Sequence, residues 1–341
     1  MSLGYQRRDR AVVDYRLFRA WEGGDWLRGP SPRDFAAGSY FACLGAAQTF
    51  GCLVREPWPE LVGDSIGLPA LNLGIAGAGP RCFLSPEFLS LANRARFVVV
   101  QVMSGRSADN PRMRTEGRER VRLDGAESPI AADLAWQRVL QNDLVGWRSP
   151  WLRGVLNRWN STFGRAEVRS LVAQTQADWL DSYRELLASI RVPKLLLWFS
   201  RRSPSHRPRY HSVSALFGEY PQLVDARMLE VIEPLADRAA RCVTMRGSPE
   251  PLRSSRDGSP VTVSPADAGT GEDPALRWTH NAYYPSSAMH EDAAAAVLRV
   301  LPASWTEAEA QAPTRIDTPL EAASENVDVS NTMAWNTNSK P

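Results

Sequence analysis

The chain has 341 residues, of which 43% are hydrophobic, so it can form one large domain or two modest ones with a sizeable core. Its 40 lysines and arginines nearly balance its 38 aspartates and glutamates, and the formal charge of +2 gives no reason to expect a nucleic-acid or membrane partner. No apolar run approaches the roughly 18 residues that a membrane-spanning helix requires.

The four cysteines form no CxxC pair, and two of them lie in or beside predicted strands. We therefore expect buried thiols that form no disulfide, as in proteins of a reducing compartment. The first residues also lack the long apolar core of a signal peptide. Both observations predict a cytoplasmic location.

Residues 1–38 are rich in arginine and aromatic residues, and we expect them to form an extended arm packed on the domain. A small hairpin around Glu22-Gly23-Gly24 is the alternative. Two short apolar runs follow, Tyr40–Leu44 and Ala70–Leu73, and each ends in a turn of small residues. Between them, Trp58–Ile66 has the apolar spacing of a helix. This order of elements predicts a βαβ unit and therefore a parallel sheet.

Two later runs predict further buried strands, Phe97–Met103 and Lys194–Phe199. We expect all four strands to be parallel neighbours in one sheet. Residues 108–190 lie between the last two strands and predict a helical insertion that caps the sheet. Its best helices are expected at Ala131–Leu144 and Arg165–Ile190, where the apolar periodicity is helical.

Polar composition predicts long loops over residues 108–129 and Gly247–Asp273. Periodicity predicts helices over Tyr220–Ala239 and Glu291–Leu301, with a short strand at Cys242–Met245 between them.

The chain therefore divides into an α/β domain and its additions. Residues 39–107 and 191–303 form the α/β domain, and the insertion interrupts it. Residues 304–341 turn to polar composition without periodicity and predict a disordered tail.

The turns of the βαβ unit carry a recognisable order of residues. The first is Gly45-Ala46-Ala47-Gln48-Thr49-Phe50-Gly51, then comes Trp58-Pro59, and the second turn is Asn72-Leu73-Gly74-Ile75-Ala76-Gly77. This resembles the SGNH (GDSL-type) hydrolases, which open with Gly-Asp-Ser-x-Thr-x-Gly and continue with a Trp-Pro helix entry and Asn-x-Gly-x-x-Gly. The resemblance implies a three-layer α/β fold with a flavodoxin-like parallel sheet. The chain also resembles a bacterial family of unknown function that shares Gly-Ala-Ala-Gln-Thr-Phe-Gly and Tyr-Tyr-Pro-Ser, which adds no chemistry.

The catalytic residues of that family are missing from the first turn. Ala47 stands where the family has its nucleophilic serine, and Ala46 stands where it has aspartate. A literal Gly63-Asp64-Ser65 occurs further on, but only six residues separate Ser65 from Asn72, too few for the intervening helix. We interpret Ser65 as the end of the first helix, with Gly67 as its stop.

Two later motifs match in part. In the resembled family the third strand ends in Gly-x-Asn-Asp, whose asparagine helps to form the oxyanion hole. Here Gly105 fits the glycine and Ser107 takes the place of the asparagine. The last family block is Asp-x-x-His before a closing helix, and here His290 matches the histidine while Ser287 takes the place of the aspartate. The resemblance thus implies His290 and Ser107 as the candidate catalytic residues.

Polar groups at the carboxyl edge of the predicted sheet suggest a pocket for an anion, because arginine forks and backbone N–H groups bind sulfate, phosphate and carboxylate. The alternative is that the arginines form a solvated rim with surface ion pairs. The predicted pocket comprises Ala47, Gln48, Asn72, Gly77, Gln101, Gly105, Arg106, Arg201, Arg202, His206, Tyr284 and Ser287.

We expect no metal and no cofactor. The histidines lack HxxH or HExxH spacing, no Walker-type phosphate loop occurs, and Gly74–Gly79 lacks the frame of a dinucleotide fingerprint.

Two functional hypotheses follow. One is an enzyme of non-standard chemistry, an esterase or an acyl or sulfuryl transferase acting on a carbohydrate or another anionic substrate, with His290 as base. The other is a catalytically inactive protein that keeps the pocket and binds an anionic small molecule or polysaccharide. The number of subunits stays open.

Overall fold

The computed structural model describes residues 2–115, 117–145, 153–209, 212–268, 273 and 275–307, and the side chains of residues 140–165 lie outside this description. Most of the predicted tail, residues 308–341, also lies outside it.

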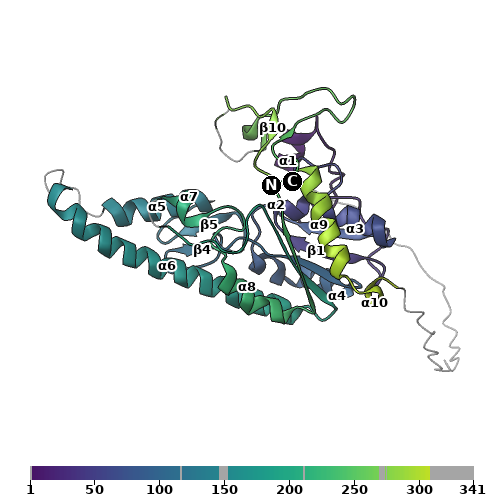
Figure 1. Cartoon of the computed structure of the whole chain (residues 1–341), viewed down its shortest axis with the longest axis horizontal. Coiled ribbons are helices and arrows are strands. Elements are labelled where there is room, and N and C mark those ends of the chain that lie inside the picture. Colours follow the sequence, from purple (N-terminus) through teal and green to yellow (C-terminus); the bar gives the residue numbers. More distant parts are fainter. Residues whose placement is uncertain are drawn as a thin grey trace, which may run out of the picture. The chain divides into compact units, whose positions relative to one another are not determined.

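The centre of the fold is a sheet of five parallel strands (Figure 1), in the order β2-β1-β3-β7-β8. The strands are β1 (Phe41–Gly45), β2 (Ala70–Gly74), β3 (Val98–Gln101), β7 (Lys194–Ser200) and β8 (Arg238–Val243). The prediction of four neighbouring parallel strands is confirmed. Every residue of β1 and β3 is buried, as expected for strands covered on both faces.

Helices cover both faces of the sheet, so the fold has three layers, as predicted. One face packs against α3 (Trp58–Ile66) and α9 (Ser287–Val300). The other face packs against α4 (Pro86–Arg94), α6 (Arg153–Ser189) and α8 (Ala226–Ile232). This is the 2-1-3-4-5 strand order of flavodoxin-like folds.

Helix α3 begins and ends as its sequence predicts. Pro59 lies in its first turn, where the missing N–H costs nothing, and Ser65 lies in its last turn. Gly67 follows with a φ of 66°, a left-handed conformation that suits glycine.

The insertion contains more than helices. Where the composition predicts a loop, β4 (Met113–Arg114), β5 (Arg120–Leu123) and β6 (Ile130–Ala131) form a small antiparallel sheet. Such short strands leave no periodicity to detect. The two predicted helices are present as α5 (Ala132–Val145) and α6, which is 37 residues long.

One helix prediction was wrong at both ends. Instead of a helix over Tyr220–Ala239, α8 ends at Ile232 and a short 3-10 turn, η3 (Glu233–Leu235), follows. Pro234 lies in this turn, and a proline does not continue a helix. Strand β8 then starts at Arg238.

The beginning of the chain packs against a late segment that we predicted to be a loop. Helix α1 (Ser2–Asp9) contacts the short helix η4 (Pro265–Ala268), and nearby β9 (Glu250–Pro251) pairs with β10 (His280–Asn281). We call α1, β9, η4 and β10 the capping layer (Figure 1).

The N-terminal arm also differs from the extended form that we preferred. Besides α1, it contains an antiparallel bridge between Phe18 and Leu27, as in the hairpin alternative.

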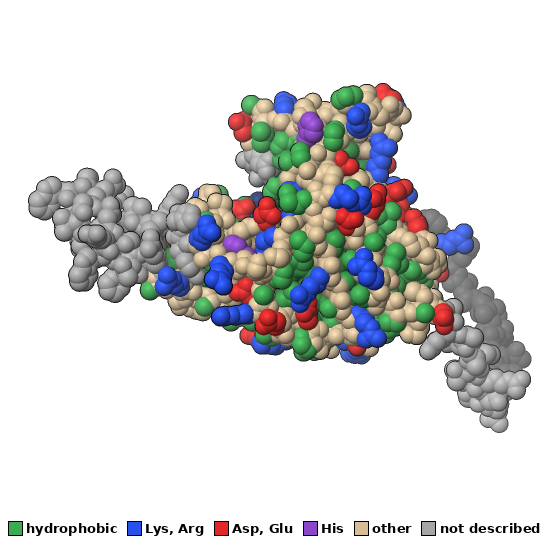
Figure 2. Space-filling view, viewed as in Figure 1, with side chains coloured by type: hydrophobic (Ala, Val, Ile, Leu, Met, Phe, Trp, Pro, Cys, Tyr) green, Lys and Arg blue, Asp and Glu red, His purple; other side chains and the backbone are tan. Residues whose placement is uncertain are grey.

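The remaining short helices are η1 (Pro80–Leu84), α2 (Ala47–Phe50), α7 (Val213–Phe217) and α10 (Ala303–Thr306). Within the described residues, no helix is both long enough and apolar enough to span a membrane. Acidic and basic side chains are interspersed over the face shown in Figure 2.

Candidate functional site

The turn after β1 is closed. Ala47 starts α2 and is only 7% exposed. It belongs to a buried cluster with Tyr5, Phe50, Ala76 and Tyr284. The position that the resemblance gives to a nucleophile therefore holds a methyl group in a buried cluster that contains aromatic side chains.

A buried ion pair lies in the same region. The guanidinium of Arg8 donates to both carboxylate oxygens of Asp9, at 2.6 and 2.8 Å. It also lies over the rings of Tyr5, Trp278 and Tyr284, at 4.8, 5.3 and 5.2 Å from their centroids. The two charges neutralise each other inside an aromatic cage, which is how a charge is tolerated in a low dielectric.

His290 lies in the core, inside α9. It is fully buried, and its Nδ1 accepts a hydrogen bond from the backbone N–H of Trp58 at 3.1 Å. Its ring meets Phe199 edge-on at 5.4 Å. Burial, with a smaller effect from the charge of Arg28, lowers the pKa of His290 to about 3, so the imidazole is neutral. It caps the first turn of α3.

The predicted role of His290 as a base does not fit this geometry. Its neighbours Trp58 and Phe199 belong to the core beneath α3 and α9, whereas Ala47 belongs to the cluster with Tyr284. The pKa of His290 also lies far below neutral pH, whereas a general base works best when its pKa is near the working pH. Ser287 is the first residue of α9, and its backbone N–H donates to the Glu250 carboxylate at 3.0 Å. The other ring nitrogen of His290, Nε2, has no hydrogen-bond partner among the described residues, so the Ser287 hydroxyl does not orient the imidazole.

The start of α9 explains the misplaced motif. The family block comes before the closing helix, but Ser287 and His290 are both inside it. The residues just before the helix are Asn281 and Tyr284, and the side-chain oxygen of Asn281 accepts from the Tyr284 N–H at 2.9 Å. Ser286 is the residue in the sequence that indicates this helix start, because its hydroxyl accepts from the Met289 N–H as an N-cap.

The side-chain amides of Asn72 and Gln101, which we predicted in the pocket, form hydrogen bonds that connect the ends of the strands. Asn72 donates to the Thr49 carbonyl and accepts from the Gly74 N–H, both at 2.9 Å. The Gln101 side-chain oxygen accepts from the hydroxyl of Thr49 at 2.7 Å. Gln48 is 9% exposed, and its side-chain oxygen has no partner among the described residues. Asn72 and Gln101 therefore support the turn structurally.

Arg106 is neutralised by carboxylates. It donates to Glu119 at 2.6 Å and to Asp133 at 2.7 Å. The Glu119 side chain packs on Gly77, which has a φ of 68° and where a Cβ would clash with that carboxylate. Burial raises the pKa of Glu119. The space above Gly77 is filled by this network.

The other predicted cations are held by backbone carbonyls. Arg201 donates to the carbonyls of Ala282 and Tyr284, at 2.6 and 2.9 Å. Arg202 donates to the Val224 carbonyl at 2.8 Å, and burial lowers its pKa to about 10.

His206 is also engaged, since its Nε2 lies 3.0 Å from the Leu216 carbonyl. The three arginines and this histidine thus have structural contacts of their own, and the predicted anion pocket gains no support from them.

Ser107 and Gly105 lie in the segment that follows β3, and Ser107 borders only a small cavity. Ser107 is 3% exposed, and its hydroxyl has no partner among the described residues. It lines a cavity of about 10 Å³ with Ser104 and Asp178, room for about one water. Gly105 donates its N–H to the Gln222 carbonyl at 2.9 Å.

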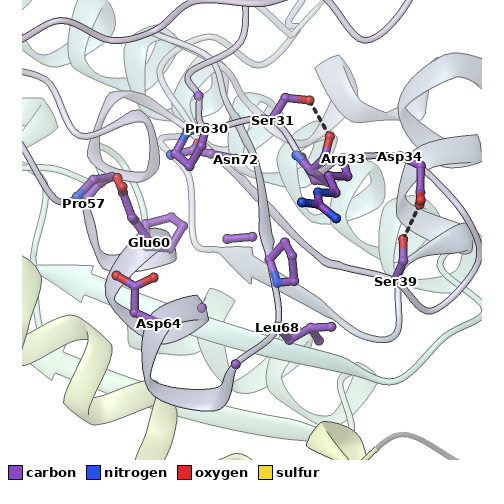
Figure 3. A pocket seen from close by; sticks show the side chains of 17 residues that line it. Pro30, Ser31, Arg33, Asp34, Ser39, Pro57, Glu60, Asp64, Leu68 and Asn72 are labelled. Atoms are coloured by element: carbon purple, nitrogen blue, oxygen red, sulfur yellow. Dashed lines mark hydrogen bonds between the residues drawn. The ribbon is translucent and has the colours of Figure 1, made fainter.

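A much larger space lies at the outer edge of β2 (Figure 3). This edge groove has a volume of about 680 Å³. Its floor is Leu68–Ala70 and Asn72, one wall is residues 29–34 with Ser39, and the other is Pro57 and the first turns of α3. Of the predicted pocket residues, only Asn72 lines it. No pattern in the sequence predicts this groove, because its walls come from the segment 29–34 and helix α3, which are separate in the chain.

Comparison with known proteins assigns the chain to a family. The chain belongs to the family described as "Domain of unknown function (DUF6473)". Its model matches residues 3–129 and 153–304. No curated protein shows a significant match.

Solved structures resemble this fold only distantly. A Lactobacillus plantarum protein is 12% identical with a TM-score of 0.36, over 77% of this chain and 96% of that one. A carbohydrate esterase family 2 enzyme with a carbohydrate-binding domain, from Corynascus thermopiles (Myceliophthora fergusii), is 11% identical with a TM-score of 0.34, over 81% and 68%. A possible lipase from Chitinophaga pinensis is 11% identical with a TM-score of 0.34, over 76% and 98%. Likeness at this level carries no argument about activity.

Proposed function

We propose that this member of the DUF6473 family is a non-hydrolytic protein that acts by binding a ligand. The observation that carries the proposal is Ala47, a methyl group at the position of a nucleophile, which is 7% exposed and belongs to a buried cluster with Tyr5 and Tyr284. Without a hydroxyl there, no acyl intermediate can form at that turn.

The esterase and transferase hypothesis would need a different set of catalytic groups. Nucleophilic attack of the serine-hydrolase type requires an imidazole beside the hydroxyl and a carboxylate to orient the imidazole. His290 instead accepts from the Trp58 N–H in the core, and Ser107 faces a space of about 10 Å³. These contacts favour binding over catalysis.

The edge groove supports the binding half of the proposal. A volume of about 680 Å³ lies within the roughly 300–1,000 Å³ that is typical of ligand sites. It lies along the edge of β2 and away from the filled strand ends, so it does not depend on the lost catalytic positions.

The test for hydrolysis uses a fluorophosphonate probe and short p-nitrophenyl esters. We expect no probe-labelled serine and no ester turnover above that of heat-denatured protein. A labelled serine identified by peptide mass spectrometry, with turnover lost when that serine is replaced by alanine, would overturn the proposal.

The test for binding is a fragment screen followed by crystallography. We expect fragments to occupy the edge groove between α3 and residues 29–34. Fragments bound only at the turn containing Ala47 would contradict this location.

A further inference from the structure

We propose that the edge groove binds an extended peptide with basic side chains, which pairs with β2 as an added strand. The inference rests on the proposed binding function and names its ligand class.

The floor of the groove is the open edge of β2, whose outward backbone groups have no strand partner among the described residues. Phe41 donates its N–H to the Pro69 carbonyl, and Ile75 donates to the Gly45 carbonyl. The backbone groups of successive β2 residues point to alternate sides. The N–H and C=O groups of Leu71 and Leu73 therefore face β1, and those of Ala70 and Asn72 face outward. Because β2 is the last strand of the sheet, these groups border the groove. Such an edge is a template for another extended chain.

Each wall of the groove contains two prolines. Pro30 and Pro32 lie in one wall, and Pro57 and Pro59 lie in the other. Proline has a fixed φ and no N–H, so these segments stay in place and cannot donate to the outward carbonyls of β2. A guest peptide meets a preformed slot, which lowers the entropy cost of binding.

The charge of the lining favours a cationic guest. Among the described residues, Asp34, Glu60 and Asp64 line the groove together with one basic residue, Arg33. Glu60 and Asp64 project from α3, and Asp34 comes from the opposite wall (Figure 3).

Two of these carboxylates have properties that favour binding of a cation. Glu60 accepts from Arg16 through Oε1, but its buried Oε2 has no partner among the described residues. Asp34 accepts from the Ala36 N–H and the Ser39 hydroxyl, and these bonds lower the pKa of Asp34, so it carries its charge.

An extended peptide satisfies both features at once. Its backbone pairs with Ala70 and Asn72, and its side chains alternate between the two faces of the sheet. Successive side chains then point toward α3 and toward the wall that contains Asp34. A second copy of this edge would bring the same carboxylates together, and like charges repel, so edge-to-edge dimerisation is disfavoured.

The test measures binding of fluorescent hexapeptides to the full chain by anisotropy. The probes are an alternating lysine–valine peptide, a glutamate–valine peptide, and a lysine–valine peptide N-methylated at every second residue. We expect only the first to bind well, and N-methylation to weaken it at least about tenfold, because it removes backbone donors. Equal binding of the N-methylated peptide, or competition by free arginine amide at the same concentration, would overturn strand pairing in favour of a small cationic ligand.

A protein variant locates the site. Asp64→Lys should weaken the lysine–valine peptide at least about tenfold. Glu185→Lys, on an exposed position of α6, is the matched control and should leave affinity unchanged. Equal affinity of Asp64→Lys and wild type would overturn the assignment to this groove, as would dimerisation through this edge detected by light scattering and abolished by Asp64→Lys.

The two proposals fail separately. Peptides that do not bind, beside fragments that do occupy the groove, overturn the peptide and leave the binding function. A serine labelled by the fluorophosphonate probe overturns the non-hydrolytic function, whatever the peptides do.

Discussion

His290 is a titratable group that the fold keeps neutral. Burial is the larger cause, and the charge of Arg28 also disfavours a second positive charge nearby. The Nδ1 atom must stay unprotonated to accept the Trp58 N–H. The folded pKa of about 3 lies below the ordinary value of about 6.5. The unfolded chain therefore takes up a proton below pH 6.5, whereas the folded chain does not. The stability that this histidine contributes is complete above pH 6.5 and is lost as the pH falls toward 3.

This difference predicts a pH effect that a variant removes. Between pH 7.5 and 5.0 the wild type should lose about 2 kcal/mol more of its unfolding free energy than His290→Gln, since about 1.5 pH units lie below 6.5 and each is worth about 1.4 kcal/mol. Urea unfolding of both proteins at the two pH values measures it. Equal losses would show that His290 is not the buried neutral group.

The Arg8–Asp9 pair predicts a large effect of a single truncation. Arg8→Ala leaves the Asp9 carboxylate, which is 0% exposed, without its cation. Breaking a buried pair in this way costs about 3–5 kcal/mol. Arg7→Ala, at an exposed position of the same helix, is the control and should change the unfolding free energy by less than about 0.5 kcal/mol. Similar urea midpoints for the two variants would contradict the buried pair.

At the scale of elements, α6 is attached to the sheet through the end of β3. The hydroxyl of Tyr183 donates to the Gln101 carbonyl at 2.8 Å and accepts from the Met103 N–H at 2.7 Å. The indole of Trp179 donates to the Met103 carbonyl at 3.1 Å. The insertion thus completes the hydrogen bonds that β3 would otherwise leave unpaired.

Tyr183→Phe should weaken this attachment. The variant keeps the ring but leaves two buried backbone groups, the Gln101 carbonyl and the Met103 N–H, without this partner, a cost of about 1–3 kcal/mol. Arg184→Ala, the exposed neighbour, should have little effect. Chemical unfolding followed by tryptophan fluorescence measures both, and a neutral Tyr183→Phe would mean that water or another group satisfies these atoms.

At the scale of the whole molecule, the reactivity of the cysteines reports how tightly the core is packed. All four are buried and none forms a disulfide. Burial raises the pKa of Cys43 and Cys52, and raises that of Cys242 to about 12, which suppresses the reactive thiolate.

We expect Ellman's reagent to label no thiol rapidly in the native protein and four thiols in guanidinium chloride. Ser65→Cys, at an exposed position of α3, should react at once and serves as the positive control. A rapidly labelled native cysteine would contradict the packing around that position.

The strands were predictable because burial on both faces leaves continuous apolar runs such as Val98–Gln101. The capping layer was not, because its strands have only two residues each and show no periodicity. The closed turn depends on Tyr5 and Tyr284, which meet from opposite ends of the chain, and no spacing rule connects them. The edge groove was missed for the same reason.

The contact between Arg8 and Tyr284 also has a consequence during synthesis. These residues are 276 positions apart, so at about 5–20 residues per second the ribosome makes the second about 14–55 s after the first. Helix α1 is therefore made well before the segment that it contacts. The Arg8–Asp9 pair joins neighbours in sequence, so it can form before the cage exists. Closure of the capping layer over Ala47 is therefore a late event, after the strands of the sheet have left the ribosome.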